Sequence, residues 1–374
     1  MKKYRNILVT GGAGFIGSHL ADQLILQGYK VRVLDNLDRQ IHPEGTLPDY
    51  FNPQAEFIRG DVTVRKDWLK ALKNTDVIYH FASAVGVGQS MYEIEKYVKV
   101  NCLGTSILLD ILANSPHSIK KIIVAASMSS YGEGSFKCNK CEIIRPGLRS
   151  QNQIDRQEWQ NYCPNCGAVV TPVPTSEIAK QESNSIYAIT KKNQEEMVLT
   201  VGQAYGIPSV ALRFFNVYGT RQSLSNPYNG VAAIFLSRLK NSKPPIINED
   251  GLQTRDFVHI SDVVSACIYS MEKSGGDYRS LNVGSGKPVT ILEVARLLAK
   301  LLNSKIEPEI SLKARKLDVR HCYADLSAIK KMLGWSPKME LSKGFQDLID
   351  WGKYEKAVDK MDHALDELEN RGLR

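Results

Sequence analysis

The sequence predicts an α/β fold built around a doubly wound parallel sheet, and two observations lead to it. An apolar run at residues 6–10 passes through a glycine-rich turn into an apolar-periodic stretch that ends near Gly28, which is the order of a strand, a tight turn and a helix. Strand-length apolar runs and helical stretches then alternate over the first two-thirds of the chain. This alternation is typical of parallel sheets built from crossover units.

The composition is that of a globular protein with room for one or two domains, at 374 residues, 43% hydrophobic and 24% charged. The formal net charge is +8, and the basic residues are scattered along the chain. Scattered charge indicates a solvated surface and suits an anionic small ligand, so we expect no nucleic-acid partner. The sequence shows neither a signal peptide nor a membrane-length apolar run, which predicts a cytoplasmic protein without a membrane partner.

Gly11, Gly14 and Gly17 follow the first strand at the spacing of a dinucleotide-binding turn. Glycines are needed where the backbone approaches a pyrophosphate and where a helix packs closely on a strand. The helix that follows offers unpaired N–H groups and the positive end of its dipole to phosphates. A glycine-rich loop without a ligand is the alternative, but the strand, helix and following acid favour a nucleotide site.

Two acidic positions extend this nucleotide site. The second strand, Val31–Leu34, ends at Asp35, whose carboxylate can accept hydrogen bonds from an adenosine ribose and would repel a 2′-phosphate. The sequence therefore favours NAD over NADP. Asp61 follows the third strand and would place an acid near the adenine, with an ordinary turn as the alternative.

Tyr187 and Lys191 are four positions apart, so on a helix they share a face. A lysine ammonium beside a phenol lowers the pKa of the phenol by favouring the phenolate; a buried tyrosine on a helix face is the alternative. Residues 121–126 read as a buried strand that ends at Ser127, and this serine can pass a proton between a substrate hydroxyl and the tyrosine. Together with the nucleotide turn, these residues predict hydride chemistry on an alcohol or ketone.

Two CxxC pairs form an insertion at residues 136–172, with the cysteines at positions Cys138, Cys141, Cys163 and Cys166. This pattern predicts a zinc ribbon with four thiolate ligands, a structural site without an open position. Disulfides are the alternative, disfavoured in a reducing cytoplasm. The insertion lies between Ser127 and Tyr187, so it leaves the fold beside the predicted active site, either as a stapled surface loop or as a lid or wall for the substrate.

The chain resembles the extended short-chain dehydrogenase/reductase family, specifically its nucleotide-sugar epimerases and dehydratases. Within the family it is most similar to the dTDP-L-rhamnose 4-epimerase subgroup. The motifs that carry the resemblance are residues 10–17, 80–82, Asn101 with Gly104 and Thr105, Ser127 with Tyr131 and Gly132, Tyr187 with Lys191, residues 213–219, 255–259 and 281–286, and Arg315 with Asp318.

By matching position, the resemblance implies a Rossmann-type NAD site and a catalytic set of Tyr187 as acid/base, Lys191 as its partner and Ser127 as assistant. The residues implied to hold NAD are Gly11, Gly14, Phe15, Ile16, Gly17, Asp35, Asn36, Asp61, Val62, Phe81, Ala82, Asn101, Tyr187 and Lys191. Those implied to hold the sugar nucleotide are Ser127, Ser129, Asn216, Asn226, Val231, Arg255, Arg315 and Asp318. Arg255 and Arg315 are the candidates for phosphate contact, since a guanidinium fork matches phosphate oxygens; a surface salt bridge is the alternative for Arg255.

Two positions of the sequence indicate which of the family's related reactions the chain can catalyse. The dehydratases that resemble this chain carry an Asp-Glu pair where it has Met128 and Ser129, and the decarboxylases usually carry a Glu at the second of these. The chemistry left is oxidation to a 4-keto sugar and re-reduction on the opposite face, which makes a 4-epimerase. The expected substrate is a dTDP-6-deoxyhexose such as dTDP-L-rhamnose. Alternatives are a UDP-sugar 4-epimerase, a reductase or decarboxylase of the same fold, or a non-enzymatic NAD-binding regulator.

The expected organisation is an NAD-binding domain over residues 1–214, which contains the insertion, and a smaller substrate-binding lobe over residues 215–350 that returns once to the sheet. A charged C-terminal helix is predicted over residues 351–374, because Tyr354, Val358, Met361, Leu365 and Leu368 recur at steps of three and four. The resemblance further implies a homodimer formed through helices near Met91–Asn114 and Tyr187–Tyr205.

Overall fold

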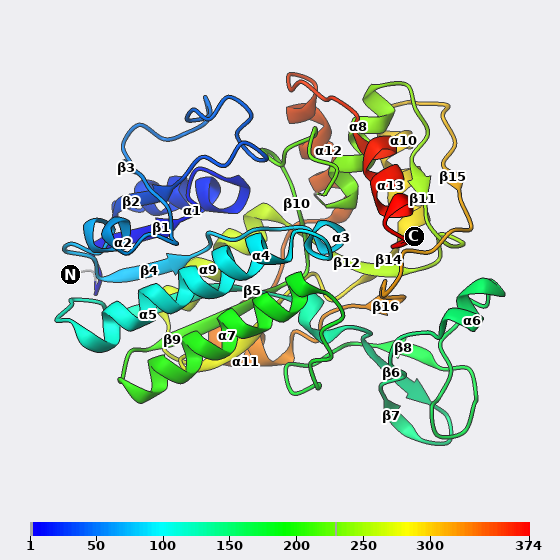
Figure 1. The fold of residues 1–374 in the computed structure, drawn as a ribbon, viewed down its shortest axis with the longest axis horizontal. Coiled ribbons are helices and arrows are strands. Elements are labelled where there is room, and N and C mark those ends of the chain that lie inside the picture. The colour runs from blue at the N-terminus through cyan, green and yellow to red at the C-terminus, as the bar shows by residue number, and fades with distance from the viewer. Residues whose placement is uncertain (1–2, 229) are drawn as a thin grey trace.

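The centre of the molecule is a parallel sheet, as the sequence predicted. The computed structural model describes residues 3–228 and 230–374, and within them this sheet has seven strands in the order β13-β9-β5-β4-β1-β2-β3 (Figure 1). The strands are β1 (Asn6–Thr10), β2 (Lys30–Asp35), β3 (Glu56–Arg59), β4 (Val77–His80), β5 (Lys121–Ser127), β9 (Ser209–Phe214) and β13 (Arg279–Val283). All seven residues of β5 are buried, as expected for a strand covered by helices on both faces.

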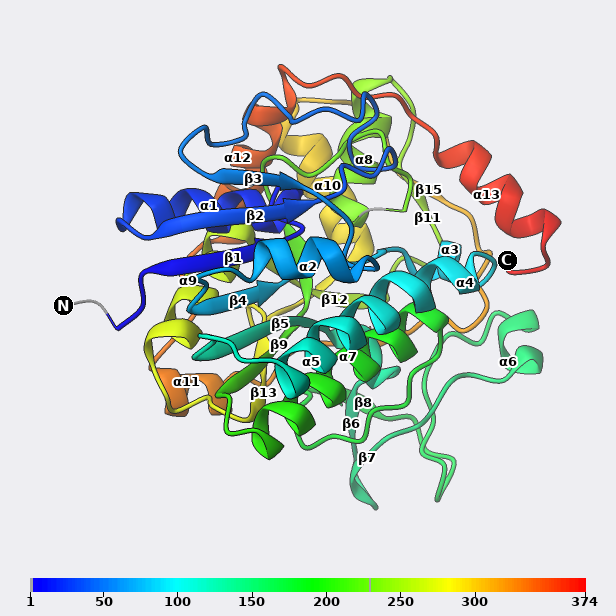
Figure 2. The same ribbon diagram turned by 60° about the vertical axis from the view of Figure 1, so that its left-hand side comes forward.

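Helices cover both faces of this sheet, which makes it doubly wound (Figure 2). One face carries α1 (Phe15–Leu26), α9 (Ile260–Glu272) and α11 (Ser327–Leu333), and the other carries α2 (Arg65–Ala71), α5 (Gly104–Asn114) and α7 (Ile186–Ala204). Each face has its own apolar core, represented by Leu20 and Val263 on the first and by Trp68, Leu108 and Val198 on the second. All five of these side chains are fully buried.

The chain reverses direction across the sheet beside β1. This strand pairs with β2 on one side and with β4 on the other, so the connections after β1 and β4 run to opposite sides. A crevice forms at the carboxyl ends of strands where such a reversal occurs, and ligands of open α/β sheets bind there. Three short elements then lead from this edge towards α5: α3 (Val87–Ser90), α4 (Ile94–Tyr97) and the π-helix η1 (Val98–Leu103).

The smaller lobe packs beyond the carboxyl end of the sheet. Its strands are β10 (Asn216–Tyr218), β11 (Ile246–Ile247), β12 (Thr254–His259), β14 (Pro288–Thr290), β15 (Glu309–Ile310) and β16 (His321–Cys322). Its helices α8 (Val231–Lys240), α10 (Ile291–Leu301) and α12 (Leu341–Gly352) share a third apolar core, centred on Phe235, Leu298 and Phe345. The chain returns from this lobe to the large sheet as β13, which pairs with β9.

The cysteine insertion projects from the body as a small antiparallel sheet (Figure 1). Its strands are β6 (Ser135–Cys138), β7 (Glu142–Ile144) and β8 (Thr171–Val173), in the order β7-β6-β8, and a short helix α6 (Gln151–Asp155) follows β7. It is fastened to the body through Thr175, whose hydroxyl accepts a 3.0 Å hydrogen bond from the Ser135 N–H.

The prediction of a single charged helix over residues 351–374 is wrong at the start of this range. The helix α12 ends at Gly352, and the last helix, α13 (Met361–Asn370), begins only at Met361. Between them the backbone finds partners outside any helix; the Val358 N–H, for example, donates to the Ser225 hydroxyl at 2.9 Å. Competing tertiary hydrogen bonds of this kind override a helical pattern. Among the described residues, no helix combines the length and the apolar character that crossing a bilayer requires.

Candidate active site

The glycine turn lies at the sheet reversal, and each glycine has a different reason to be one. Gly11 has φ of +68°, and a Cβ there would lie 2.9 Å from the Ala82 nitrogen. A Cβ at Gly17 would lie 2.3 Å from the Gly11 carbonyl oxygen, which forces close packing of α1 on the turn. At Gly14 a Cβ would meet only that same oxygen, at 3.4 Å, so its outer side is open.

The start of α1 fits a dinucleotide phosphate. Gly14 is the N-cap of α1 and provides no side-chain cap, so the N–H groups of Phe15, Ile16 and Gly17 have no partner within the helix. Unpaired N–H groups beside an open glycine form an anion site. These residues are therefore suited to hold the pyrophosphate of NAD.

The acids predicted around the ribose and adenine are already engaged with the backbone. Asp35 accepts hydrogen bonds from the N–H groups of Ala13 at 3.0 Å and Leu37 at 2.9 Å, which ties the end of β2 to the glycine turn. Burial raises the pKa of Asp35. Asn36 donates to Asp61 at 3.0 Å. Burial acts to raise the pKa of Asp61, but hydrogen bonds from Thr63 and Asn36 hold it below its usual value.

The remaining residues predicted to hold NAD fall into two groups: some lie at the rim of the crevice, and others support it from beneath. Phe81 and Ala82 follow β4, and both of their N–H groups donate to the Thr10 hydroxyl at 3.1 Å. The carbonyl of Val62 accepts from the Trp68 indole at 2.7 Å. Asn101 lies beneath the crevice and is fully buried; its side chain exchanges hydrogen bonds of 2.8 and 3.1 Å with the Ala84 backbone and donates to Thr190 at 3.0 Å. In the structure Asn101 therefore supports the crevice.

The structure brings Ser127 and Tyr187 together, and their side chains form a hydrogen bond. Ser127 ends β5, and its hydroxyl caps the 3₁₀ turn η2 (Met128–Tyr131) by accepting from Ser129, at 3.2 Å from its N–H and 2.9 Å from its hydroxyl. Tyr187 lies in the first turn of α7, which Ser185 caps. The Tyr187 N–H donates to the Ser90 hydroxyl at 3.0 Å, and its ring meets the Tyr97 ring edge-on at a centroid distance of 6.4 Å.

The predicted electrostatics of Tyr187 need a correction. Burial raises the pKa of its phenol, and the hydrogen bond with Ser127 is what opposes this. Burial also lowers the pKa of Lys191 to about 7, so at neutral pH its ammonium is only partly populated. A lowered phenol pKa therefore requires a further positive charge nearby, such as the pyridinium of oxidised NAD.

Lys191 terminates a buried chain of hydrogen bonds that the sequence did not predict. Its Nζ donates to Gln194 at 2.8 Å and to Ser83 at 3.4 Å. Gln194 donates to Thr105 at 2.9 Å, and Thr105 lies 2.9 Å from a ring nitrogen of His80. The other ring nitrogen of His80 lies 2.9 Å from the hydroxyl of Thr10, the last residue of β1. This chain joins the strand that ends at the glycine turn to Lys191, the lysine predicted to assist catalysis. In the sequence, only the motif residues His80 and Thr105 indicated it.

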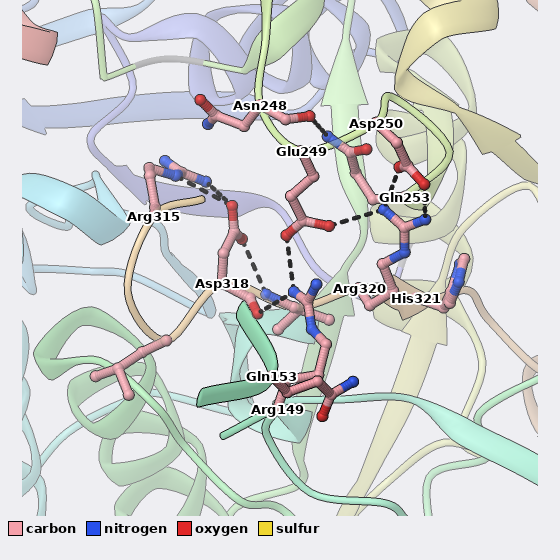
Figure 3. A network of polar contacts seen from close by, with 12 residues as sticks. Arg149, Gln153, Asn248, Glu249, Asp250, Gln253, Arg315, Asp318, Arg320 and His321 are labelled. Carbon is pink, nitrogen blue, oxygen red and sulfur yellow. Dashed lines mark hydrogen bonds and ion pairs between the residues drawn. The ribbon is translucent and has the colours of Figure 1, made fainter. Parts of the chain in front are cut away.

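Two residues predicted to hold the sugar nucleotide, Arg315 and Asp318, contact each other in the smaller lobe (Figure 3). Asp318 accepts two hydrogen bonds from Arg315, at 3.1 and 2.8 Å, and one from Arg255 at 3.2 Å. Arg255 pairs with Asp318 and not with the adjacent Asp256, whose buried carboxylate accepts from Ser285, Gly286 and Ala324. The two arginines thus share one carboxylate, and the terminal nitrogens of Arg255 also donate to the main-chain oxygens of Thr254, Val319 and Arg320.

The other predicted substrate contacts lie between β10 and α8. The side-chain oxygen of Asn216 is buried and has no hydrogen-bond partner among the described residues, and an orphaned buried acceptor of this kind indicates a ligand or water. Asn226 is buried and accepts from the Tyr228 N–H at 3.0 Å. Val231 begins α8, whose N-cap, Gly230, provides no side-chain cap.

The C-terminal helix covers this region. A cavity of about 30 Å³ lies between Arg315 and Asp318 on one side and Leu368 of α13 on the other, room for about one water molecule. Glu367 of α13 accepts hydrogen bonds from the hydroxyls of Tyr92 at 2.9 Å and Tyr228 at 2.7 Å. A sugar nucleotide bound at Arg315 and Asp318 therefore requires α13 and the loop beneath it to move apart.

The four cysteines of the insertion converge. The sulfur atoms of Cys138, Cys141, Cys163 and Cys166 all lie within 4.8 Å of one another. The Cys138 and Cys166 sulfurs are 3.6 Å apart, which is too far for a disulfide bond. Four sulfurs at such separations match the edges of a tetrahedron of zinc–thiolate bonds.

Comparisons with known proteins identify the family of the chain. The model of the NAD dependent epimerase/dehydratase family matches residues 7–150 and 165–284. The chain belongs to this family. The match omits residues 151–164, which lie in the middle of the cysteine insertion, and covers the rest of the insertion.

Individual relatives narrow the class of reaction. The dTDP-L-rhamnose 4-epimerase of Burkholderia thailandensis is 34% identical over 93% of this chain and 94% of the relative. The UDP-glucose 4-epimerase of Thermotoga maritima, solved with UDP-glucose, has a TM-score of 0.76 and 30% identity over 93% of this chain and 98% of its own. The UDP-glucuronic acid 4-epimerase of Bacillus cereus, solved with UDP-glucuronic acid and NAD, has a TM-score of 0.74 and 27% identity over 93% and 99%. This family member is an NAD-dependent nucleotide-sugar epimerase.

Proposed function

We propose that this epimerase inverts C4 of a dTDP-6-deoxyhexose such as dTDP-L-rhamnose. The observation that carries the proposal is the meeting of Ser127 and Tyr187 at the end of β5 without a carboxylate at Met128 or Ser129. A dehydratase or decarboxylase needs such a carboxylate to move a second proton or assist the loss of a group. The dTDP sugar is favoured by the relative from Burkholderia thailandensis, and the Thermotoga maritima structure favours a UDP sugar as the alternative.

The chain's own residues supply proton transfer and orientation. Tyr187 takes the proton of the sugar hydroxyl, and Ser127 holds that hydroxyl while the carbon becomes a ketone. NAD, when bound, accepts a hydride from the sugar carbon and returns it. The ketone would turn about its phosphate linkage so that the hydride returns to the opposite face of the carbonyl carbon, and Tyr187 gives the proton back to the sugar oxygen. Arg255 and Arg315 hold the diphosphate during this rotation, because their forks match phosphate oxygens.

We also propose that the four cysteines of the insertion hold a structural zinc ion, because four thiolate ligands leave no open coordination position on the metal. Reduced cysteines in this arrangement suit the cytoplasm. We further propose a homodimer that forms through α4, η1 and α7, because Ile94, Val98, Leu103 and Ile189 on these neighbouring helices are 45–51% exposed. Exposed apolar side chains gathered on one surface are typical of an interface.

The reaction is tested by incubating the protein with dTDP-L-rhamnose, UDP-glucose and UDP-glucuronic acid and following the sugar protons by NMR. Inversion at C4 of the dTDP sugar without added cofactor supports the proposal. Inversion of a UDP sugar alone replaces the substrate but keeps the chemistry. Turnover that consumes NADH in proportion to product, or that releases CO₂, contradicts an epimerase mechanism.

A further inference from the structure

Two arginine side chains of the cysteine insertion extend out of the insertion and pack against the body of the protein. Both belong to residues 145–149, between β7 and α6. Arg145 donates to the main-chain oxygens of Tyr131 and Glu133, directly after the turn that Ser127 caps. Arg149 donates to Glu249 at 2.7 Å and to the main-chain oxygen of Asp318 at 3.3 Å. The side chain of Arg149 is only 2% exposed.

These contacts converge on the segment that carries Arg315 and that accepts hydrogen bonds from Arg255. Asp318, whose main-chain oxygen Arg149 contacts, binds Arg315 through its carboxylate (Figure 3). The same carboxylate accepts a hydrogen bond from Arg255. The acceptor Glu249 also binds Arg320 at 2.7 Å. From the other side, Glu133 accepts hydrogen bonds from the backbone N–H groups of residues 320 and 321 at 2.6 and 3.1 Å. The insertion therefore contacts both the catalytic turn and residues 318–321.

Stability alone does not account for burying Arg149. Its Nε and one terminal nitrogen are buried without a partner among the described residues, so the charge is desolvated and only partly compensated. A buried ion pair is weak evidence for stability. Residues 311–320 are irregular and form a loop between β15 and β16, and a loop that binds a ligand gains affinity when its geometry is fixed beforehand.

We propose that Arg149 is a positioning residue for the substrate diphosphate. Through Glu249 and the backbone of Asp318 it fixes the loop so that Arg255 and Arg315 lie side by side. Arg315 binds Asp318 through Nε and one terminal nitrogen and is 36% exposed, so its other terminal nitrogen is free to meet a phosphate oxygen. The inference rests on the proposed function, and it makes the cysteine insertion part of the substrate site.

Nucleotide binding tests this role apart from turnover. We compare Arg149→Met with the wild type by isothermal titration with dTDP and UDP, alongside NAD content and the KM and kcat of the epimerase reaction. We expect about tenfold weaker nucleotide binding and a similar rise in KM, with NAD content unchanged and kcat within about threefold. Glu249 keeps Arg320 in this variant, so no carboxylate is left unpaired.

Two further variants separate positioning from general damage. A single nitrogen of Arg149 makes both of its hydrogen bonds, so Arg149→Lys can replace them and should restore most of the affinity. Arg156 lies in the same insertion, and within residues 3–228 and 230–374 its side chain pairs only with Glu158 on the surface. Arg156→Met is therefore the matched control and should bind nucleotide as the wild type does. If Arg149→Met does not fold, Glu249→Gln carries the test, with an expected loss of about threefold in affinity.

The outcomes distinguish this inference from the proposed function. Unchanged nucleotide affinity in Arg149→Met, or in Glu249→Gln where that variant is used, overturns the positioning role alone. An equal loss of nucleotide affinity in Arg156→Met also overturns the positioning role, because any substitution in the insertion would then weaken binding. A wild type that binds neither dTDP nor UDP overturns the proposed substrate class and the inference together.

Discussion

Lys191 donates a 2.8 Å hydrogen bond to Gln194, three residues further along α7. Gln194 continues through Thr105 and His80 to Thr10 at the end of β1. The lysine that is to hold the nicotinamide ribose is thus oriented by the same buried chain that ends at the glycine turn. A change at either end is expected to affect the other, because the groups between them are fully buried and a lost hydrogen bond is costly there.

Tyr187→Phe should abolish epimerisation while NAD stays bound. The substitution removes the only atom assigned to take the proton of the sugar hydroxyl, and loss of a general base costs at least about 100-fold in kcat. The measurement is C4 inversion by NMR, with NAD released by denaturation and quantified by absorbance. Tyr205→Phe, at the C-cap of the same helix and 57% exposed, is the control. Full activity in Tyr187→Phe would remove the tyrosine from the mechanism.

Lys191→Met should make the protein more stable at pH 7 and less active. The pKa of Lys191 is lowered by burial from 10.5 to about 7, so between these values the unfolded chain binds a proton that the folded one does not. The free energy of unfolding of the wild type therefore rises with pH between 7 and 10.5. Below pH 7 the folded chain bears the full cost of the buried ammonium. Thermal unfolding at pH 6, 7 and 9 should show a gain for the variant that shrinks as pH rises. A lower melting temperature at every pH would contradict this account.

The substitutions Gly14→Ala and Gly17→Ala should impair different properties, NAD binding in the first and stability in the second. A Cβ at Gly17 would lie 2.3 Å from the Gly11 oxygen, so overpacking should cost about 1–3 kcal/mol of stability. A Cβ at Gly14 fits the protein at 3.4 Å but occupies the open side of the turn where the pyrophosphate should approach. Gly14→Ala should therefore keep its melting temperature and lose NAD. Retention of NAD by Gly14→Ala would place the cofactor elsewhere.

Elemental analysis of the purified protein should find about one zinc ion per chain. Cys163→Ser removes a buried ligand of the four-cysteine cluster and should reduce the zinc content to near zero. Cys267→Ala, whose thiol lies in the core away from the cluster, should keep its zinc. Zinc-free wild-type protein with reduced cysteines would contradict the metal site.

The protein should lose stability steeply in acid, in part through His80. Burial lowers the pKa of His80 from 6.5 to about 3, so between these values the unfolded chain binds the proton and the folded chain does not. Stability therefore falls as pH drops from 6.5 towards 3. His80→Gln can keep hydrogen bonds to Thr10 and Thr105 without titrating, so its unfolding free energy should fall less between pH 7 and 4.5. An unchanged slope would show that the other buried histidines account for the acid sensitivity.

Much of the cofactor half could be predicted from the sequence because it depends on local geometry. The spacing of Gly11, Gly14 and Gly17 reflects a turn of only a few residues, and Asp35 follows its strand directly. The four cysteines converge for the same reason, since each CxxC pair fixes two ligands on one knuckle. The tail was mispredicted where tertiary contacts intervene, since the Val358 N–H binds Ser225 instead of continuing a helix.

By itself, the sequence determined the parallel sheet and the glycine turn at its edge, and it predicted a catalytic role for Tyr187, because periodicity and short-range spacing indicate these features. Only the tertiary structure decided what surrounds them. The phenol of Tyr187 has its pKa raised by burial, Asn101 supports the crevice from beneath, and Arg149 reaches Glu249, 100 positions along the chain. Burial and long-range pairing depend on how distant segments pack, and no pattern within one segment records that packing.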